Sequence, residues 1–186
     1  MRIIAGEFKG RRLIAPRGKK TRPTTDRVRE SLFNWITHHK DIELVGANIL
    51  DLFAGTGALG LEALSRGAAH VSFVEKDRDA LHALRHNVQS LGVEDRCEIY
   101  PLDANHLQSS TKRHEIIFLD PPYGAGLGEK ALLRAKTRDW LHNNCWVVWE
   151  SAREEALDIE PTRFIIDEKR HFGTTCITLA HPLREN

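Results

Sequence analysis

The stretch that decides the fold is Ile49-Leu50-Asp51-Leu52-Phe53-Ala54-Gly55-Thr56-Gly57-Ala58-Leu59-Gly60. Its apolar beginning is typical of a buried strand, its small middle residues indicate a tight turn, and the apolar spacing that continues through Leu64 favours a helix. Gly55 and Gly57 have no Cβ to keep a ligand off the backbone, and the N–H groups that open the next helix point into the same space. The turn is therefore a predicted ligand site. It also reads Gly-x-Gly-x-x-Gly, a weak motif that dinucleotide-binding enzymes share.

A second motif, Asp120-Pro121-Pro122-Tyr123, follows the strand-like run Glu115–Leu119. Each proline fixes its own φ and restricts the residue before it, so the strand is predicted to end in a rigid ledge suited to a planar ring. Together with Asp51-x-x-x-Gly55-x-Gly57, the motif resembles the class I S-adenosylmethionine-dependent methyltransferases. The resemblance is to the branch that methylates exocyclic amino groups of nucleobases.

Size and composition favour one domain over residues 1–186, because 186 residues with 41% hydrophobic side chains can bury a proper core. Cys97, Cys145 and Cys176 are widely spaced and include no Cys-x-x-Cys, which argues against a disulfide framework and a zinc knuckle and fits a reducing cytosol. No stretch has the pattern of a signal peptide or a membrane span. We expect a soluble, cytoplasmic monomer without membrane contact.

Charge is divided unevenly along the chain. The net charge is +1, yet residues 1–22 hold eight basic residues and only Glu7 as an acid, a local balance of +7 that leaves −6 for the remainder. Such asymmetry is typical of a nucleic-acid-binding arm, although a solvated tail that only aids solubility stays an alternative. The predicted RNA-binding residues are Arg2, Lys9, Arg11, Arg12, Arg17, Lys19, Lys20, Arg22 and Arg27.

The basic arm, residues 1–24, is predicted to form a β-hairpin and a loop. Met1–Ala5 and Arg11–Ala15 read as its two strands, and residues 16–23, rich in proline, glycine and lysine, read as a loop that tracks over a polyanion. A helix should follow from residues 24–26, because Thr24, Thr25 and Asp26 are N-cap candidates. Its predicted buried face is Val28, Leu32, Trp35 and Ile36, with Arg27 and Arg29 on other faces.

The segment Arg22–Trp35 resembles the one before the cofactor loop in the bacterial small-subunit rRNA guanine-N2 methyltransferase family, RsmD. With Met1–Leu13, both motifs above and the C-terminal hairpin, the resemblance covers essentially the whole chain. It implies methylation of the N2 amino group of one guanosine in 16S rRNA, within the small ribosomal subunit or an assembly intermediate. It also implies S-adenosyl-L-methionine as cofactor, S-adenosyl-L-homocysteine as product, and no metal.

Two further acids complete the predicted cofactor site. Glu75 follows the strand-like run His70–Val74, where an α/β nucleotide site places a carboxylate for the ribose hydroxyls; a simple helix-start acid is the alternative. Asp103-Ala104 follows strand Arg96–Tyr100, and the resemblance implies that this acid reaches the adenine amino group. The full predicted set is Asp51, Phe53, Ala54, Gly55, Thr56, Gly57, Glu75, Lys76, Asp103, Ala104 and Asp120.

The predicted catalytic residues are Asp120, Pro121, Pro122 and Tyr123. The guanine amine is a poor nucleophile because its lone pair is delocalised into the ring. The Asp120 carboxylate and the Pro121 carbonyl can accept its two N–H bonds, which localises the lone pair as the amine attacks. Tyr123 would stack on the base, and a base that is removed from its stack is cheapest to present from an RNA loop.

The remaining pattern predicts a doubly wound α/β sheet. Helices are expected over Ala58–Arg66, Asp79–Leu91 and Glu129–Leu141, a buried strand over Cys145–Glu150, and a closing hairpin from Arg163–Asp167 and Thr174–Leu179. The resemblance adds a Rossmann-like sheet of seven mostly parallel strands with one antiparallel strand near the edge. His82 and His86, spaced i and i+4, are assigned to the surface, and Trp140, Trp146 and Trp149 to the core.

Other functions stay open from the sequence. A DNA adenine-N6 methyltransferase shares the Asp-Pro-Pro-Tyr chemistry, but no insert large enough for a target-recognition region is visible. An NAD-dependent oxidoreductase would explain Gly55–Gly60 and Glu75 but leaves Asp120–Tyr123 without a role. An RNA-binding module with a decayed active site is disfavoured by the intact Asp120 and Tyr123.

Overall fold

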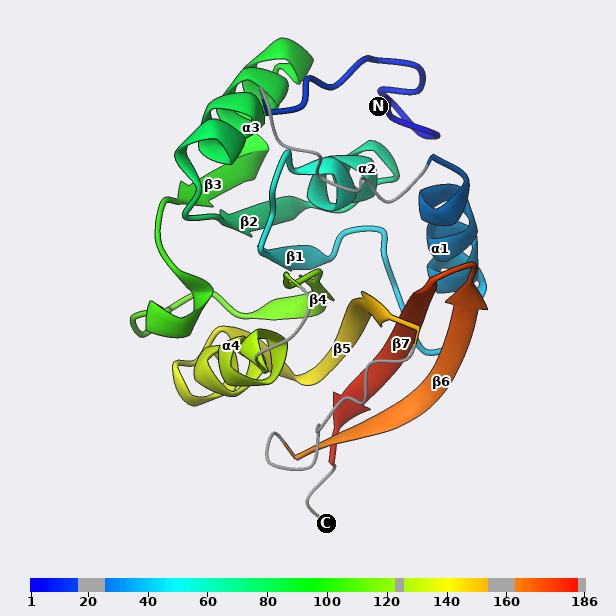
Figure 1. The fold of residues 1–186 in the computed structure, drawn as a ribbon, viewed down its shortest axis with the longest axis vertical. Coiled ribbons are helices and arrows are strands. Elements are labelled where there is room, and N and C mark those ends of the chain that lie inside the picture. The colour runs from blue at the N-terminus through cyan, green and yellow to red at the C-terminus, as the bar shows by residue number, and fades with distance from the viewer. Residues whose placement is uncertain (17–25, 123–125, 154–162, 184–186) are drawn as a thin grey trace.

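The computed structural model describes residues 1–16, 26–122, 126–153 and 163–183. Strands and helices alternate along most of the chain, as Figure 1 shows. In chain order the elements are α1 (Asp26–His38), β1 (Asn48–Leu52), α2 (Ala58–Ser65), β2 (His70–Val74), α3 (Arg78–Leu91), η1 (Glu94–Arg96), β3 (Cys97–Tyr100), η2 (Ala104–His106), β4 (His114–Leu119), α4 (Leu127–Thr137), β5 (Leu141–Ala152), β6 (Phe164–Phe172) and β7 (Thr175–Pro182).

The strands form one seven-stranded sheet in the order β3-β2-β1-β4-β5-β7-β6. The first five strands of that order pair in parallel. Strand β7 is antiparallel to both of its neighbours, β5 and β6, and lies one place from the sheet edge. The predicted mostly parallel sheet with one antiparallel strand is confirmed.

Helices cover both faces of this sheet. Alternate residues of the central strands belong to two separate core clusters: Ile49 and Phe118 pack with α1, α2 and α3, whereas Leu50 and Leu119 pack with α4. Figure 1 shows α2 and α3 above the central strands and α4 on the opposite side. The two-sided burial explains why these strands are apolar runs without alternation. In the described part of the chain, no helix is long and apolar enough to cross a membrane.

The N-terminal hairpin differs from the prediction. Its two arms meet at a single antiparallel bridge, Arg2 with Arg12, and form no named strands. The Ile3 amide donates to the Arg11 carbonyl at 2.9 Å and the Leu13 amide to the Met1 carbonyl at 3.1 Å. The next two amides, of Ile4 and Ala5, donate instead to the Glu62 carboxylate of α2, at 2.7 and 3.1 Å. The pairing of the arms thus stops near Ile3, and a buried acid on α2 satisfies the backbone donors that follow.

Arg29 also departs from its predicted place, because its side chain is 1% exposed, on the same buried surface of α1 as Leu32 and Phe33. Its guanidinium donates to the Arg2 carbonyl and lies 3.9 Å from Glu62. Arg66 donates to the other Glu62 oxygen at 2.7 Å. The sequence rule that places arginine outside fails here because Glu62 provides a buried counter-charge.

The boundary between α4 and β5 lies earlier than predicted. The helix ends at Thr137, and β5 begins at Leu141 and runs to Ala152. Asp139 adopts a left-handed conformation, φ 62°, and the Trp140 amide donates back to the Ala135 carbonyl. The apolar Trp140 and Leu141 continue the helical spacing, which is why the pattern extended the helix. Trp140, Trp146 and Trp149 are buried, as predicted.

We expect Glu62→Gln to destabilise the fold by about 3–5 kcal/mol, because it removes the buried counter-charge of Arg29 and Arg66 and leaves Arg29 only the partly exposed Asp26, 3.1 Å away. The amide also turns a donor toward the Ile4 or Ala5 N–H. Urea unfolding measures the loss, and trypsin cleavage after Arg11 or Arg12 reports release of the N-terminal segment. Glu30→Gln, on the exposed side of α1, is the matched control. Equal stability of the two variants would contradict this role of Glu62.

Candidate active site

Acidic residues stand at or just beyond the carboxyl ends of five adjacent strands. Asp103 follows β3, Glu75 follows β2, Asp51 lies near the end of β1, Asp120 follows β4, and Glu150 lies near the end of β5. Because these strands are parallel, all five acids occupy one edge of the sheet. The strand order reverses between β1 and β4, and the crevice outside such a switch point is where open α/β sheets bind ligands.

Asp51 is buried beneath the glycine turn, with 2% of its surface exposed. Its carboxylate accepts a hydrogen bond from the Gly60 amide at 3.0 Å, which fastens the end of β1 to the first turn of α2. Burial raises the pKa of Asp51 to about 7, an effect that the Gly60 bond partly opposes and the charge of Glu75 reinforces. Asp51 is therefore close to half protonated near neutral pH.

The turn itself adopts conformations that few residues tolerate. Phe53 has φ 64°, which is uncommon for a residue with a side chain, and Gly57 has φ 77°. A Cβ on Gly57 would lie 2.4 Å from Leu84 Cδ1, so glycine is required there for packing as well. A Cβ on Gly55, by contrast, would meet nothing nearer than the Phe53 carbonyl at 4.0 Å. The backbone at Gly55 is open to a ligand.

Glu75 holds the other side of the turn. Its Oε2 accepts from the Gly55 amide at 2.7 Å, and its Oε1 accepts from the amides of Lys76 and Asp77 at 2.8 and 2.7 Å. The carboxylate thus accepts hydrogen bonds both from the glycine turn and from the start of α3, where Asp77 is the N-cap. An oxygen with two lone pairs can accept a second donor, so Oε2 can also receive a hydroxyl.

Asp103 is engaged by its neighbours. Its Oδ2 forms an ion pair with Lys76 at 2.7 Å, and its Oδ1 accepts from the Asn105 amide at 2.9 Å. The Lys76 hydrogen bond, followed by the Asn105 bond, lowers the pKa of Asp103 to about 2. Beside it, Asn105 Oδ1 is buried and has no hydrogen-bond partner among the described residues, and Ala104 is buried. Asn105 Oδ1 is therefore available to accept a hydrogen bond from an amino group of a ligand.

Asp120 ends β4 beside two other acids. Burial raises the pKa of its carboxyl group well above the ordinary range, and the charges of Glu150 and Asp51 raise it further. Glu150 is 6% exposed and is paired with Ile177 in the β5–β7 register. Sequence reasoning assigned no role to Glu150. The available signal was an acid directly after the apolar run Cys145–Trp149, on the strand that neighbours the Asp120 motif.

Pro121 rests on a packed support. A Cβ on Gly128, in the first turn of α4, would lie 2.4 Å from Trp149 Cζ2 and 3.0 Å from Pro121 Cγ. The ring of Trp149, 1% exposed, thus lies close to both Gly128 and Pro121. This close packing supports Pro121, the second residue of the predicted ledge. Tyr123, the last residue of the motif, lies outside the described residues.

The predicted RNA-binding residues differ in their exposure and in their contacts with other protein groups. Lys9, Arg12 and Arg27 are exposed. Arg2 forms an ion pair with Asp26 at 3.4 Å, and the Arg11 guanidinium donates to the Ser90 carbonyl on α3. Arg17, Lys19, Lys20 and Arg22 lie outside the described residues.

His82 and His86 are exposed on α3, as predicted. Among residues 1–16, 26–122, 126–153 and 163–183, no group of three or more histidine, cysteine or acidic side chains is arranged to hold a metal ion.

Comparison with known proteins identifies the family. The family model described as "Conserved hypothetical protein 95" matches residues 1–181. Ribosomal RNA small subunit methyltransferase D of Escherichia coli K12 is 36% identical over 179 residues, covering 96% of this chain and 88% of that protein. The chain belongs to the RsmD family. This membership agrees with the family resemblance that the sequence motifs carry.

Solved structures agree with the RsmD assignment. A candidate methyltransferase of Escherichia coli, yhhF, superposes with a TM-score of 0.84 at 36% identity, covering 98% of this chain and 97% of that chain. A magnesium protoporphyrin IX methyltransferase from Synechocystis PCC 6803, solved with bound SAM, has a TM-score of 0.66 at 13% identity, covering 84% and 79%. The fold is the class I methyltransferase fold.

We expect Asp51→Asn to stabilise the protein above neutral pH. The folded pKa of about 7 lies above the unfolded value, so the aspartate's contribution is present at low pH and is lost as pH rises through 7. Asparagine does not ionise and can still accept from Gly60. Its advantage should grow to about 1–4 kcal/mol between pH 5 and pH 8, measured by urea unfolding. Asp79→Asn, at an exposed site, is the control; a difference independent of pH would contradict the prediction.

Proposed function

We propose that this chain uses S-adenosyl-L-methionine to methylate the exocyclic N2 amino group of one guanosine in the 16S rRNA of the small ribosomal subunit. The observation that carries the proposal is the row of acids at the carboxyl edge, with Asp51 and Glu75 around an open glycine turn and Asp120 one strand away. The E. coli relative that is 36% identical is named as a small-subunit rRNA methyltransferase. Its name supports the substrate class, and the choice of guanine N2 is our inference.

The residues present fit this cofactor. A sulfonium carries a positive charge, and the two groups with raised pKa values, Asp51 and Asp120, would regain their ionised form beside a cation. Gly55 leaves its backbone open, Glu75 Oε2 can accept a ribose hydroxyl, and Asn105 Oδ1 offers an unused acceptor to the adenine amine. Asp103 Oδ2, which pairs with Lys76, also has a second lone pair with which it can share in that contact. When bound, S-adenosyl-L-methionine supplies an electrophilic methyl group.

Asp120 and Pro121 act on the base in the proposed mechanism. The Asp120 carboxylate and the Pro121 carbonyl each accept one N–H of the guanine amine, which pulls the nitrogen lone pair out of conjugation. As the C–N bond forms, the nitrogen becomes acidic, and its proton passes to Asp120 or to water. Burial, reinforced by the neighbouring charges of Glu150 and Asp51, makes the Asp120 carboxylate a better proton acceptor. The close approach of Gly128 to Pro121 helps to keep the carbonyl in place.

The basic N-terminal segment, residues 1–16 of the described chain, supplies the proposed RNA contact. Lys9 and Arg12 are exposed, whereas Arg2 and Arg11 also bind protein groups. Phosphate contacts of this kind position an RNA without reading its sequence. A DNA adenine-N6 methyltransferase would use the same Asp120 chemistry, and the RsmD membership of the chain favours rRNA over DNA.

We expect Asp120→Asn to lower the rate of methyl transfer at least a hundredfold, because the amide has one acceptor oxygen fewer and cannot take the proton. Transfer of labelled methyl to unmodified small ribosomal subunits, followed by nucleoside analysis, measures the rate and identifies the product. The affinity for S-adenosyl-L-homocysteine, by calorimetry, should stay within about threefold of wild type. Asp41→Asn, at an exposed site, is the control.

Two outcomes of that experiment would contradict the proposal. Wild-type kinetics in Asp120→Asn would remove the carboxylate from the mechanism. N6-methyladenine formed in duplex DNA, with no N2-methylguanosine formed in subunits, would replace the proposed substrate with that of the DNA enzyme.

Combined replacement of Lys9 and Arg12 by alanine should weaken binding of the small-subunit rRNA and reduce the slope of log K against log salt by about 2, roughly one per lost phosphate contact. The slope is measured by filter binding between 50 and 200 mM salt. Lys40→Ala with Lys130→Ala, both exposed on other elements, removes equal charge as a control. An unchanged slope in the Lys9 and Arg12 variant would contradict the RNA contact and support the alternative that the segment only aids solubility.

A further inference from the structure

Asn87, on α3, joins two parts of the chain that the proposed function treats separately. Its side chain is fully buried. The Nδ2 group donates to the Ile14 carbonyl at 3.1 Å and to the Thr56 carbonyl at 3.0 Å, and Oδ1 accepts from the Ile14 amide at 2.8 Å. Ile14 belongs to the basic N-terminal segment, and Thr56 lies in the glycine turn between β1 and α2. One amide therefore bridges the predicted RNA-binding segment and the predicted cofactor turn.

The chemistry of its partners fixes the orientation of this amide. The Ile14 amide can only donate, so it must face Oδ1, and the two carbonyls can only accept, so both must face Nδ2. The donors and acceptor of the side chain match all three partners at once. A shift of either segment would leave a buried polar group without its partner, which is costly.

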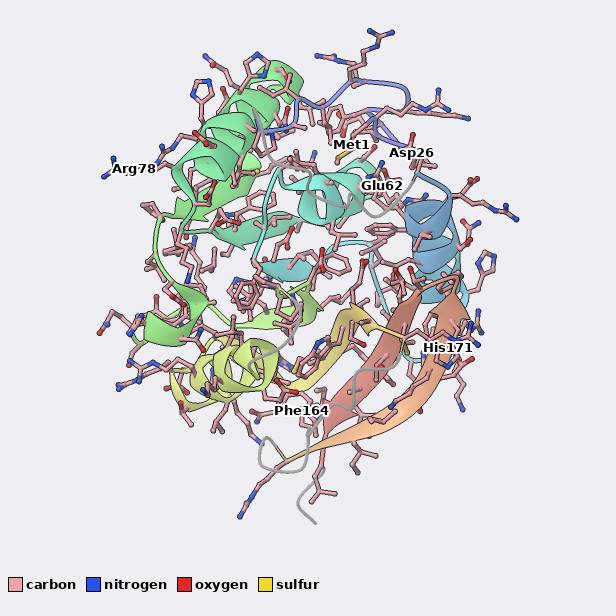
Figure 2. The ribbon with its side chains drawn as sticks, viewed as in Figure 1. Met1, Asp26, Glu62, Arg78, Phe164 and His171 are labelled. Carbon is pink, nitrogen blue, oxygen red and sulfur yellow. The ribbon has the colours of Figure 1, made fainter. Side chains whose placement is uncertain are left out.

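Other contacts hold the N-terminal segment against α2 and α3. The Phe8 amide donates to Ser65 Oγ on α2 at 2.9 Å, and the Arg11 guanidinium donates to the Ser90 carbonyl on α3. Thr56 also contacts the segment from its own side chain, because its Oγ1 lies 3.6 Å from Met1 Sδ. Figure 2 shows Met1 and Glu62 together where the segment crosses α2, and Figure 1 shows the segment reaching from there toward α3. The glycine turn thus contacts the segment at Thr56.

We propose that Asn87 is a positioning residue that couples the N-terminal segment to the glycine turn, so that cofactor binding in the turn orders the RNA-binding segment and RNA binding tightens the hold on the cofactor. The inference rests on the proposed function, since it takes the turn as the cofactor site and the segment as an RNA contact. Coupling is reciprocal by thermodynamic necessity: if the cofactor strengthens the RNA contact, RNA strengthens the cofactor contact by the same factor.

A purely structural role for Asn87 makes a different prediction. If Asn87 only stabilises the fold, its replacement should lower the unfolding temperature and leave unchanged the effect of each ligand on the affinity for the other. Coupling, in contrast, appears as a response of residues 1–16 to a ligand that binds at residues 53–57. Hydrogen exchange at the Ile14 amide is the direct readout, because that amide donates to Asn87 Oδ1.

The test compares wild type with Asn87→Asp and Gln89→Glu. Asn87→Asp keeps the acceptor for Ile14 but replaces the donor with an oxygen that faces the Ile14 and Thr56 carbonyls. Gln89→Glu makes the same amide-to-acid change at an exposed position of the same helix. Exchange of the peptide covering residues 1–16 is measured with and without saturating S-adenosyl-L-homocysteine, and the affinity for that ligand is measured with and without unmodified small ribosomal subunits. If Asn87→Asp does not fold, Asn87→Ala replaces it.

In wild type and Gln89→Glu, the ligand should slow exchange at Ile14, and subunits should tighten ligand binding by about fivefold or more. In the Asn87 variant the ligand should still bind, while both effects shrink to within twofold of no change. Equal protection and equal tightening in all three proteins would overturn the coupling alone. Failure of wild type to bind S-adenosyl-L-homocysteine would overturn the proposed function and the coupling with it.

Discussion

The hydrogen bond from the Gly60 amide to the Asp51 carboxylate is the contact on which the rest of this structure depends. It ties the carboxyl end of β1 to the first turn of α2 and so sets the path of the five residues between them. The conformation of those residues tolerates few substitutions, because Phe53 and Gly57 both have positive φ and Gly57 has no space for a Cβ. The position of α2 then determines where Glu62 and Ser65 are available to the N-terminal segment.

The acids at the carboxyl edge carry an energetic conflict that this hydrogen bond only partly relieves. Burial and the nearby charge of Glu75 disfavour the ionised form of Asp51, and burial with the charges of Glu150 and Asp51 disfavours that of Asp120. A fold selected for stability alone would not place acids at the ends of five adjacent strands. Strain and unfavourable charge of this kind concentrate at functional sites, where a ligand of opposite charge relieves them.

Most of the sheet was predictable because its signals are local. The apolar runs of β1, β2 and β4 and the glycines after α2 and α3 define elements within a few residues of one another. Glu75 and Asp120 stood out because each directly follows such a run, and Asp51 because it lies four residues before Gly55 in the glycine motif. Glu62, Arg29 and Asn87 were not, because each owes its burial to partners 27 to 73 residues away, and no local pattern separates such residues from a solvated helix face. The missing hairpin strands have the same cause, since the competing acceptor is a distant side chain.

The attachment of the N-terminal segment has a consequence for the order of events during synthesis. Ile4 and Glu62 are 58 residues apart, and Ile14 and Asn87 are 73 apart. The segment is synthesised before α2 and α3, yet it has no docking surface until both helices have been made. Closing loops of this length costs entropy before any contact repays it. The segment therefore comes before α2 and α3 in synthesis but after them in folding, and in that interval its backbone amides lack their partners on the two helices.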